Sequence, residues 1–157
     1  MRLISRRAAL TAAVTVVAGC SLPKDTSGTL ERARGGVLRV GVSHNPPYTV
    51  VREGRDPSGS EVDLVTEFAG VLGSRPEWHV AGEGELARRL HHGEIDVLVG
   101  GLMEESPLAD EIAFTRSYAT VTDTRGKEQK LVLAVRPGEN ALLVALEKFL
   151  AEKEQKR

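Results

Sequence analysis

Residues 85–100 read ELARRLHHGEIDVLVG, and this stretch decides the fold class. In its first half, Leu86 and Leu90 lie one helical turn apart, and Gly93 ends the predicted helix over residues 85–92. In its second half, residues 96–100 form a largely apolar strand, which is typical of a parallel sheet covered on both faces. A helix that leads directly into such a strand indicates an α/β protein.

Strands and helices also alternate outside this stretch. β-branched runs, apolar residues at helical spacing and flanking turn residues predict further strands at residues 37–42, 78–80 and 130–135, and helices that begin near residues 60 and 140. Ser60 is the expected N-cap of the first of these helices, with Asp63 as its capping-box partner, and Asn140 is the expected N-cap of the second. We therefore expect an α/β domain with a mainly parallel sheet flanked by helices.

The N-terminus has the layout of a secretory signal. Three arginines lie among the first seven residues, no acidic residue precedes position 25, and an apolar run covers residues 8–18. Eleven residues are too few to cross a bilayer as a helix, which needs about 20. We therefore expect residues 1–19 to be a removable signal peptide rather than a transmembrane anchor.

Residues 17–20, Val-Ala-Gly-Cys, resemble the lipobox of bacterial lipoproteins. The resemblance implies that Cys20 becomes the first mature residue and carries acyl chains such as palmitate. Cys20 is the only cysteine of the chain, so no intramolecular disulfide competes for it. An ordinary signal peptide cut beside a cysteine is the alternative. The Arg6-Arg7 pair leaves open whether export follows the general or the twin-arginine route.

Composition limits what the mature protein can be. Removing residues 1–19 leaves 18 basic against 22 acidic residues, a net charge of −4, which disfavours a nucleic-acid partner. Residues 20–36 are polar and contain Pro23 and the Gly35-Gly36 pair, so we expect a lipidated tether there. Residues 37–157 have the length of one domain.

Five short segments occur in an order that carries a family resemblance. They are residues 38–42 followed by Pro46-Pro47-Tyr48, Gly59 with Val62-Asp63-Leu64, residues 90–97 followed by Gly100-Gly101-Leu102, Phe114-Thr115 with Tyr118, and residues 131–150. Together they are similar to the bacterial extracellular solute-binding proteins of family 3. The resemblance implies a periplasmic-binding-protein-like α/β lobe that binds a solute outside the cytoplasm for an ABC importer, with its permease as a partner.

The chain departs from this family in length. Where the family inserts its second α/β lobe, this sequence has only residues 119–129, which are too few to form one. We therefore expect a short form with a single lobe and half a cleft, anchored to the cell envelope membrane through Cys20. The first function to consider is the substrate-binding component of an ABC-type uptake system. The alternative is an interaction or sensor lipoprotein that docks another envelope protein without transporting a solute.

The resemblance also implies where a ligand lies. Asn45 and Glu83 stand where the family's amino-acid binders carry aromatic residues, and Leu108 stands where they carry an arginine that holds the ligand carboxylate. The surface has gained acid and lost its anion-binding fork, so a small polar solute, cationic or neutral, is expected rather than a free amino acid. The expected ligand-binding residues are Asn45, Tyr48, Glu83, Gly100, Gly101, Leu102, Met103, Glu104 and Glu105.

Several of these residues also have a purely structural explanation. Tyr48 follows two prolines and can pack against the rim of the domain. Gly100 and Gly101 end a strand at the carboxyl edge of the sheet, where α/β proteins bind ligands, but a tight turn also requires glycine. Glu104 and Glu105 are equally compatible with an exposed loop.

Other reactive residue types give no convincing site. Glu61 and Asp63 lie in the first turn of a predicted helix, and the helix dipole accounts for acids there. His91 and His92 are adjacent and point to different sides of a helix, so they are not a chelating pair. The sequence shows no nucleophile elbow and no Walker loop. We therefore expect no metal site, no cofactor and no enzymatic activity.

Overall fold

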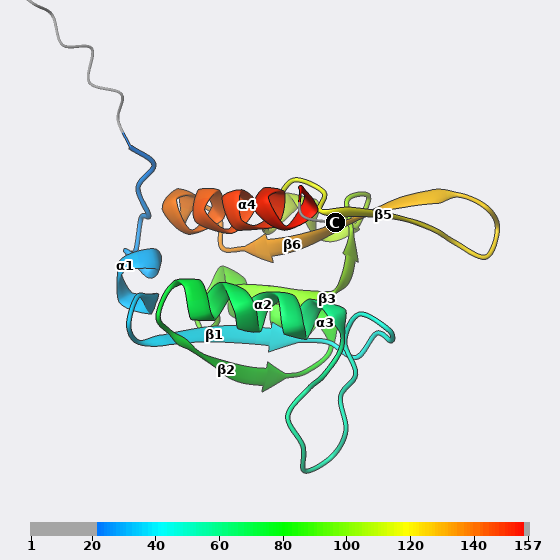
Figure 1. Cartoon of the computed structure of the whole chain (residues 1–157), viewed down its shortest axis with the longest axis horizontal. Coiled ribbons are helices and arrows are strands. Elements are labelled where there is room, and N and C mark those ends of the chain that lie inside the picture. The colour runs from blue at the N-terminus through cyan, green and yellow to red at the C-terminus, as the bar shows by residue number, and fades with distance from the viewer. Residues whose placement is uncertain (1–21, 156–157) are drawn as a thin grey trace, which may run out of the picture.

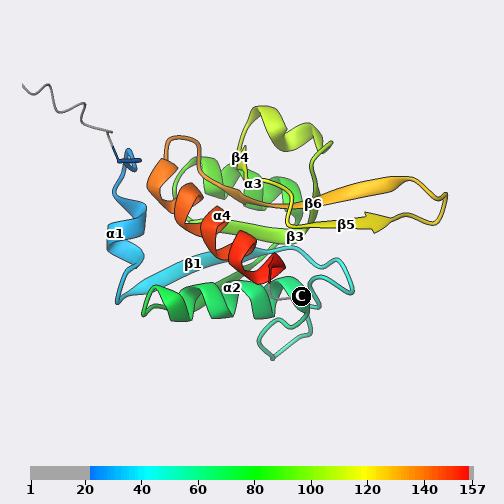
Figure 2. The same cartoon turned by 45° about the horizontal axis from the view of Figure 1, so that its top comes forward.

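The structure, a computed structural model, describes residues 22–155, in which one sheet stands between helices on its two faces (Figure 1, Figure 2). The helices are α1 (Thr29–Ala33), α2 (Ser60–Val71), α3 (Glu83–His91), the 3-10 helix η1 (Pro107–Asp110) and α4 (Asn140–Glu154). The strands are β1 (Val37–Val42), β2 (Arg75–Val80), β3 (Val97–Met103), β4 (Ala113–Phe114), β5 (Ala119–Thr122) and β6 (Glu128–Val135). The predicted signal peptide and Cys20 lie outside the described residues.

The sheet is mixed rather than mainly parallel. Its order is β2-β1-β3-β6-β4, with β5 pairing along another part of β6. β1 runs parallel to β2 and β3, whereas β6 is antiparallel to β3, β4 and β5. A parallel neighbour needs a crossover connection, usually an α-helix, and the chain between β3 and β6 contains only η1 and short strands. The expected α/β lobe is confirmed, but parallel pairing is limited to three of the six strands.

The core is divided between the two faces of the sheet. α2 and α4 pack on one face, where the rings of Phe68 and Phe149 lie 5.5 Å apart between centroids. α3 covers the other face, where Leu86 and Leu90 are fully buried against β3 and β6. None of the helices within residues 22–155 combines the length and apolar character that crossing a bilayer requires.

Two helix starts differ from the sequence-based expectation. α2 begins at Ser60, so its N-cap is Gly59, and the expected capping box with Asp63 is not formed. Gly59 has φ 120°, and a Cβ there would lie 2.4 Å from the carbonyl oxygen of Tyr48, so the chain enters the helix where only glycine fits. α4 likewise begins at Asn140, and Glu139 is its N-cap residue.

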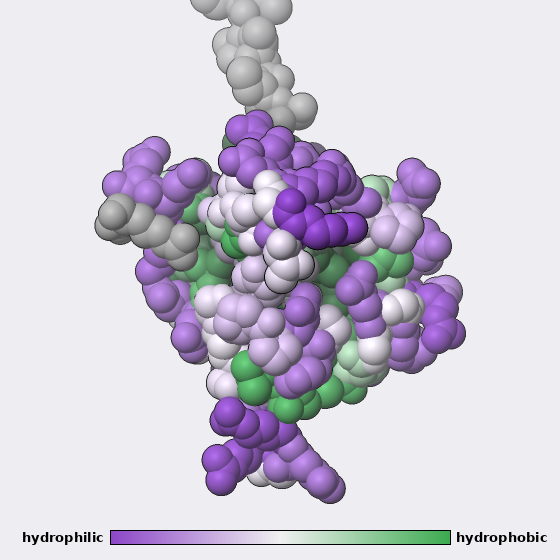
Figure 3. All heavy atoms as spheres, turned by 90° about the vertical axis from the view of Figure 1, so that its right-hand side faces the viewer, coloured by the Kyte–Doolittle hydropathy of each residue, from purple (hydrophilic) through white to green (hydrophobic). Residues whose placement is uncertain are grey.

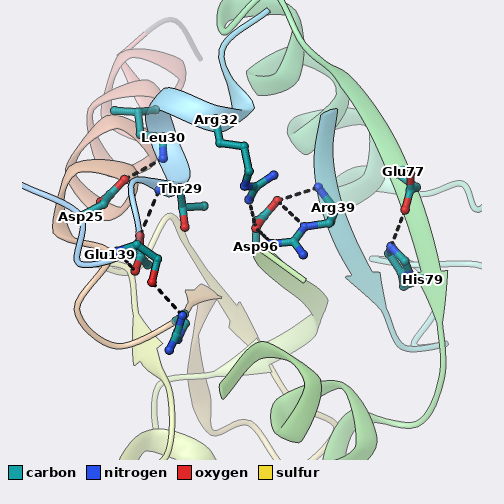
Figure 4. Close-up of polar contacts among 11 residues, drawn as sticks. Asp25, Thr29, Leu30, Arg32, Arg39, Glu77, His79, Asp96 and Glu139 are labelled. Carbon is teal, nitrogen blue, oxygen red and sulfur yellow. Dashed lines mark hydrogen bonds and ion pairs between the residues drawn. The ribbon is translucent and has the colours of Figure 1, made fainter. Parts of the chain in front are cut away.

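The second half of the segment expected to be a tether is folded onto the lobe. It contains α1, whose Ala33 is fully buried, and it is bonded to the start of α4 (Figure 4). Asp25 accepts hydrogen bonds from the backbone nitrogens of Leu30 (2.7 Å) and Leu142 (2.9 Å). Glu139 in turn accepts from the backbone nitrogens of residues 27 (2.9 Å) and 29 (3.2 Å). Asp25, which precedes α1, thus caps the start of α4, and Glu139, which precedes α4, caps the start of α1.

Replacing Asp25 tests this reciprocal capping. We expect Asp25→Ala to lower the free energy of unfolding by about 1–2 kcal/mol, because one capping side chain lost typically costs that much and this one serves two helices. Urea unfolding followed by circular dichroism measures the change. The exposed neighbour Lys24 supplies the control, and Lys24→Ala should leave the midpoint unchanged. Equal midpoints for Asp25→Ala and the parent chain would show that the caps contribute nothing.

Residues 119–129, which replace the second lobe, begin a β-hairpin. β5 and β6 pair antiparallel from Ala119–Leu131 to Thr122–Glu128, and the tip is closed by the Asp123 nitrogen bonding the Lys127 oxygen at 2.9 Å. Figure 1 shows the hairpin reaching outward beyond the helices. The expectation of a short form without a second lobe is met, and the replacement is an ordered hairpin.

Candidate ligand-binding site

The carboxyl ends of β1, β2 and β3 share one edge of the sheet, and two open hollows lie there. The first hollow, about 530 Å³, is lined by residues 43–45, 80–83 and Gly100. The second hollow, about 340 Å³, is lined by Glu83, residues 101–103, Glu105, Ser106 and Gln129. Figure 3 shows the molecule from this end, where hydrophilic residues surround smaller hydrophobic patches. Glu83 lines both hollows, so it marks the centre of the candidate site.

A bulge in β3 shapes the floor of this site. β3 pairs with β6 at Leu98 and again at Leu102, and the register shifts between them, at the Gly100-Gly101 pair. Gly101 has φ 65°, and a Cβ there would lie 2.5 Å from the Tyr48 ring and 2.6 Å from the amide nitrogen of Asn45. Both the backbone conformation and the close approach therefore require glycine.

Asn45 and Tyr48 are held against this bulge. The side-chain nitrogen of Asn45 donates to the Gly100 oxygen at 2.8 Å, and the Tyr48 ring packs on Gly101. Both side chains are half-buried. Asn45 lines the first hollow, whereas Tyr48 lines neither hollow. The structure thus places Tyr48 as support beneath the bulge.

Glu61 lies directly behind the bulge and is fully buried. One carboxylate oxygen accepts from the backbone nitrogens of Gly100 (2.8 Å) and Gly101 (2.9 Å), and the other accepts from the Tyr118 hydroxyl (2.5 Å). Burial raises the pKa of Glu61 above its ordinary value, although these hydrogen bonds act in the opposite direction. Sequence reasoning assigned Glu61 only to the helix dipole. The one feature of the sequence that could have indicated this role is an acidic residue directly after Gly59-Ser60, where α2 begins.

The acidic residues expected to face a cation are not equivalent. Glu104 pairs with Lys130 at 3.2 Å and Glu105 with Lys127 at 2.6 Å, so both acids bind the hairpin. The hydrogen bond and charge of Lys127 lower the pKa of Glu105 below its ordinary value. Glu83 is exposed in the first turn of α3, and of the three acids it alone has no ion pair among the described residues. Glu83 is therefore the one of these three acids whose carboxylate is not engaged by a lysine of the hairpin.

The arginine position of the family is apolar in space as well as in sequence. Leu108 lies in η1, half-buried against the core beneath α3. Ser106 caps η1 by accepting from the Leu108 nitrogen at 3.3 Å, so the segment is ordered without a guanidinium. In residues 22–155 no group of three or more His, Cys, Asp or Glu side chains is placed to hold a metal ion. The polar groups that line the two hollows are carboxylate, amide, hydroxyl, imidazole and backbone groups.

The sequence profile of the bacterial extracellular solute-binding proteins, family 3, matches residues 38–157. The chain belongs to this family. The match covers β2 to β6, all of β1 except its first residue Val37, and α2 to α4, whereas α1 lies before it. Family 3 membership was expected from the sequence and is confirmed.

Solved structures of family 3 domains share the fold. Domain 1 of TmArgBP, from T. maritima, in its arginine-bound form is 29% identical with a TM-score of 0.66, over 78% of this chain and 97% of that chain. A point mutant of the same domain, also arginine-bound, is 27% identical with a TM-score of 0.71, over 81% of this chain and 98% of that chain. An ancestral cationic amino acid solute-binding protein reaches a TM-score of 0.71 at 14% identity, which shows the fold alone. The single lobe thus corresponds to one domain of this family.

The curated relatives are larger proteins. Membrane-bound lytic murein transglycosylase F from Vibrio cholerae is 35% identical over 92 residues, which are 57% of this chain and 17% of that protein. The protein of the same name from Maricaulis maris is 31% identical over 118 residues, 71% of this chain and 25% of that protein. This chain therefore spans a quarter or less of the length of these relatives. The chain's membership of an extracellular family places it outside the cytoplasm.

Proposed function

We propose that the chain is a solute-binding lipoprotein that captures a small cationic or polar solute for an ABC-type uptake system. The observation that carries the proposal is the pair of hollows at the carboxyl edge, joined at an exposed and unpaired Glu83. Strand ends at this edge are the usual ligand side of open α/β sheets. Such a role needs no catalytic residue, and we propose none.

A single lobe of this family is sufficient to bind a solute in one relative. Domain 1 of TmArgBP, of which 97% is matched by this chain, has an arginine-bound form. Arginine is cationic, and the site here offers a free carboxylate at Glu83 and no guanidinium at Leu108. A half cleft leaves one face of the ligand in water, where each ion pair contributes only about 0–1 kcal/mol. We therefore expect a dissociation constant of about 1 mM for the chain alone.

Calorimetry of the full chain in neutral detergent tests solute binding. We expect arginine to bind more tightly than glutamate, and Glu83→Gln to weaken arginine binding up to about five-fold, the effect of losing one exposed ion pair. Glu85→Gln is the matched control, because Glu85 lies on the same helix, is exposed and lines neither hollow. Preference for glutamate, or arginine binding that Glu83→Gln leaves unchanged, would contradict the proposed site.

The proposed lipid anchor has a separate test. Cells grown with a labelled fatty acid should label the parent chain and leave Cys20→Ala unlabelled, because the thiol of Cys20 is the only one available for acylation. Stable retention at the membrane implies more than one acyl chain, since a single chain gives only marginal binding. Equal labelling of both chains would exclude Cys20 as the anchor.

The second candidate function is an interaction or sensor lipoprotein that docks an envelope protein. It is favoured by the curated relatives, which are membrane-bound murein transglycosylases and share only part of their length with this chain. Uptake separates the two functions. Cells that lack the protein are given the labelled solute that the chain binds. Reduced accumulation of this solute supports the transport component, whereas unchanged accumulation supports the sensor.

A further inference from the structure

A polar cavity lies at the opposite end of the sheet from the two hollows. Figure 4 shows Arg32, Arg39, Asp96 and Glu139 from its lining. Its volume is about 260 Å³, and its walls come from α1 and the residue Ser27 before it, β1, the chain just before β3 and the chain after β6. Three arginines line it: Arg32, Arg39 and Arg136. Two carboxylates, Asp96 and Glu139, and two hydroxyl residues, Ser27 and Thr29, complete its charged and polar lining.

The two carboxylates are already saturated with donors. Asp96, only 2% exposed, accepts from Arg32 Nη2 (2.5 Å) and Arg39 Nη2 (2.6 Å) with one oxygen. Its other oxygen accepts from the backbone nitrogen (2.9 Å) and Nε (3.2 Å) of Arg39. Glu139 is 1% exposed and accepts hydrogen bonds from the backbone nitrogens of residues 27 and 29. Burial opposes the ionisation of Glu139, but hydrogen bonds from Thr29 and Ser27 hold its pKa below the ordinary value.

The arginines, in contrast, keep unused donors. A guanidinium carries five N–H groups and no acceptor. Arg32 uses one nitrogen on Asp96, and Arg39 uses two side-chain nitrogens on it. Arg136 donates through Nη1 to the Ser27 hydroxyl at 2.9 Å and makes no ion pair among the described residues. The side chains of Arg32 and Arg39 are 43% and 27% exposed, so they face water from the cavity wall.

Charge and donor count together favour an anion here. Three guanidiniums stand against two carboxylates, an excess of one positive charge in a chain whose mature part carries a net charge of −4. Arginine forks match phosphate oxygens in geometry, and their hydrogen bonds to phosphate are charge-assisted. Arg136, whose printed hydrogen bond is to the neutral Ser27 hydroxyl, is the one of these three arginines without a carboxylate partner among the described residues.

We infer that this cavity binds a phosphate group, with Arg136 as its principal contact and Arg32 and Arg39 as flanking donors. The inference does not depend on solute binding at the other edge. Ser27 follows Cys20 by seven residues, a span of at most about 25 Å, so an anchored lobe would present this cavity to the phospholipid headgroups. The phosphate could therefore belong to a lipid headgroup or to a free phosphate ion.

A phosphate titration of the full chain in neutral detergent at low salt tests the cavity. We expect inorganic phosphate to shift the nuclear magnetic resonance signals of the arginine side chains and to raise the thermal midpoint, whereas chloride at equal ionic strength does neither. Arg136→Gln should weaken phosphate binding at least about five-fold, the effect of about 1 kcal/mol. Arg125→Gln, an exposed arginine of the hairpin tip, is the matched control and should bind as the parent does.

The source of the phosphate is separated in a second arm. Neutral micelles doped with phosphatidylglycerol should raise the thermal midpoint of the parent chain more than that of Arg136→Gln if the lipid is the ligand, and added phosphate should compete. A response to phosphate alone assigns the site to the free ion. If Arg136→Gln fails to fold, Ser27→Ala, which removes the hydroxyl that Arg136 contacts, replaces it and should also weaken binding. Identical responses of the parent and folded variants to both probes would overturn the inference.

Discussion

Removing α4 should abolish cooperative unfolding of the lobe. A chain that ends at Glu139 loses the four buried side chains by which α4 packs on the sheet: Leu142, Leu146, Phe149 and Leu150. Each contributes roughly 1.5–3 kcal/mol on burial, so about 6–12 kcal/mol is lost from a domain stability of about 5–15 kcal/mol. Urea unfolding followed by near-ultraviolet circular dichroism measures the outcome.

The control truncation ends at Glu154 and keeps all of α4. It should unfold with the midpoint of the full chain, because it keeps all four buried side chains of α4. A sharp two-state transition in the chain that ends at Glu139 would mean that α4 is not part of the cooperative unit.

Glu61→Ala should destabilise the lobe by about 3 kcal/mol or more. The substitution leaves the buried nitrogens of Gly100 and Gly101 without their carboxylate partner, and each unsatisfied buried group costs about 1–3 kcal/mol. It also leaves a cavity behind the bulge of β3. Chemical denaturation at neutral pH gives the change in free energy, and the exposed Glu67→Ala on the same helix should stay within about 0.5 kcal/mol.

Glu61→Gln distinguishes shape from charge at the same position. An amide oxygen can accept from both glycine nitrogens as the carboxylate does. Because burial raises the pKa of Glu61, the stability that its protonation contributes is fully present below the unfolded pKa, about 4.3, and is lost as pH rises through the folded value. At neutral pH we therefore expect Glu61→Gln to be at least as stable as the parent. A loss as large as that of Glu61→Ala would show that the negative charge itself is required.

The parts of the fold that sequence predicted are those with a local signal. The helical spacing before Gly93 and the apolar run of β3 are such signals, and both elements are present within a few residues of the expected bounds. α1 was not predicted, because its first turn depends on Glu139, which is 110 residues away in the sequence, as well as on the nearby Asp25. The antiparallel direction of β6 was likewise not visible in the sequence, since it follows from the missing crossover helix.

The candidate site was predicted in location but not in its internal bonding. Gly100, Gly101 and Asn45 lie together at the sheet edge, as their positions after strands indicate. Glu104 and Glu105 were expected to face a ligand, yet both pair with lysines of the hairpin that lie more than twenty residues away in the sequence. No local sequence pattern predicted this hairpin. Solute binding at this edge remains a prediction, and calorimetry of the parent chain and Glu83→Gln tests it.

The hairpin of β5 and β6 makes the lobe modular. Its two strands leave and re-enter the body side by side, and the tip between Asp123 and Lys127 is closed by its own backbone hydrogen bond, with the Lys127–Glu105 ion pair joining it to the body. Extending such a tip costs little closure entropy, about 0.6 kcal/mol for each doubling of loop length. A whole domain can thus be gained or lost here while the sheet keeps its register. The same tip is accordingly the point at which a reporter protein could be inserted, to convert ligand binding at the neighbouring edge into an optical signal.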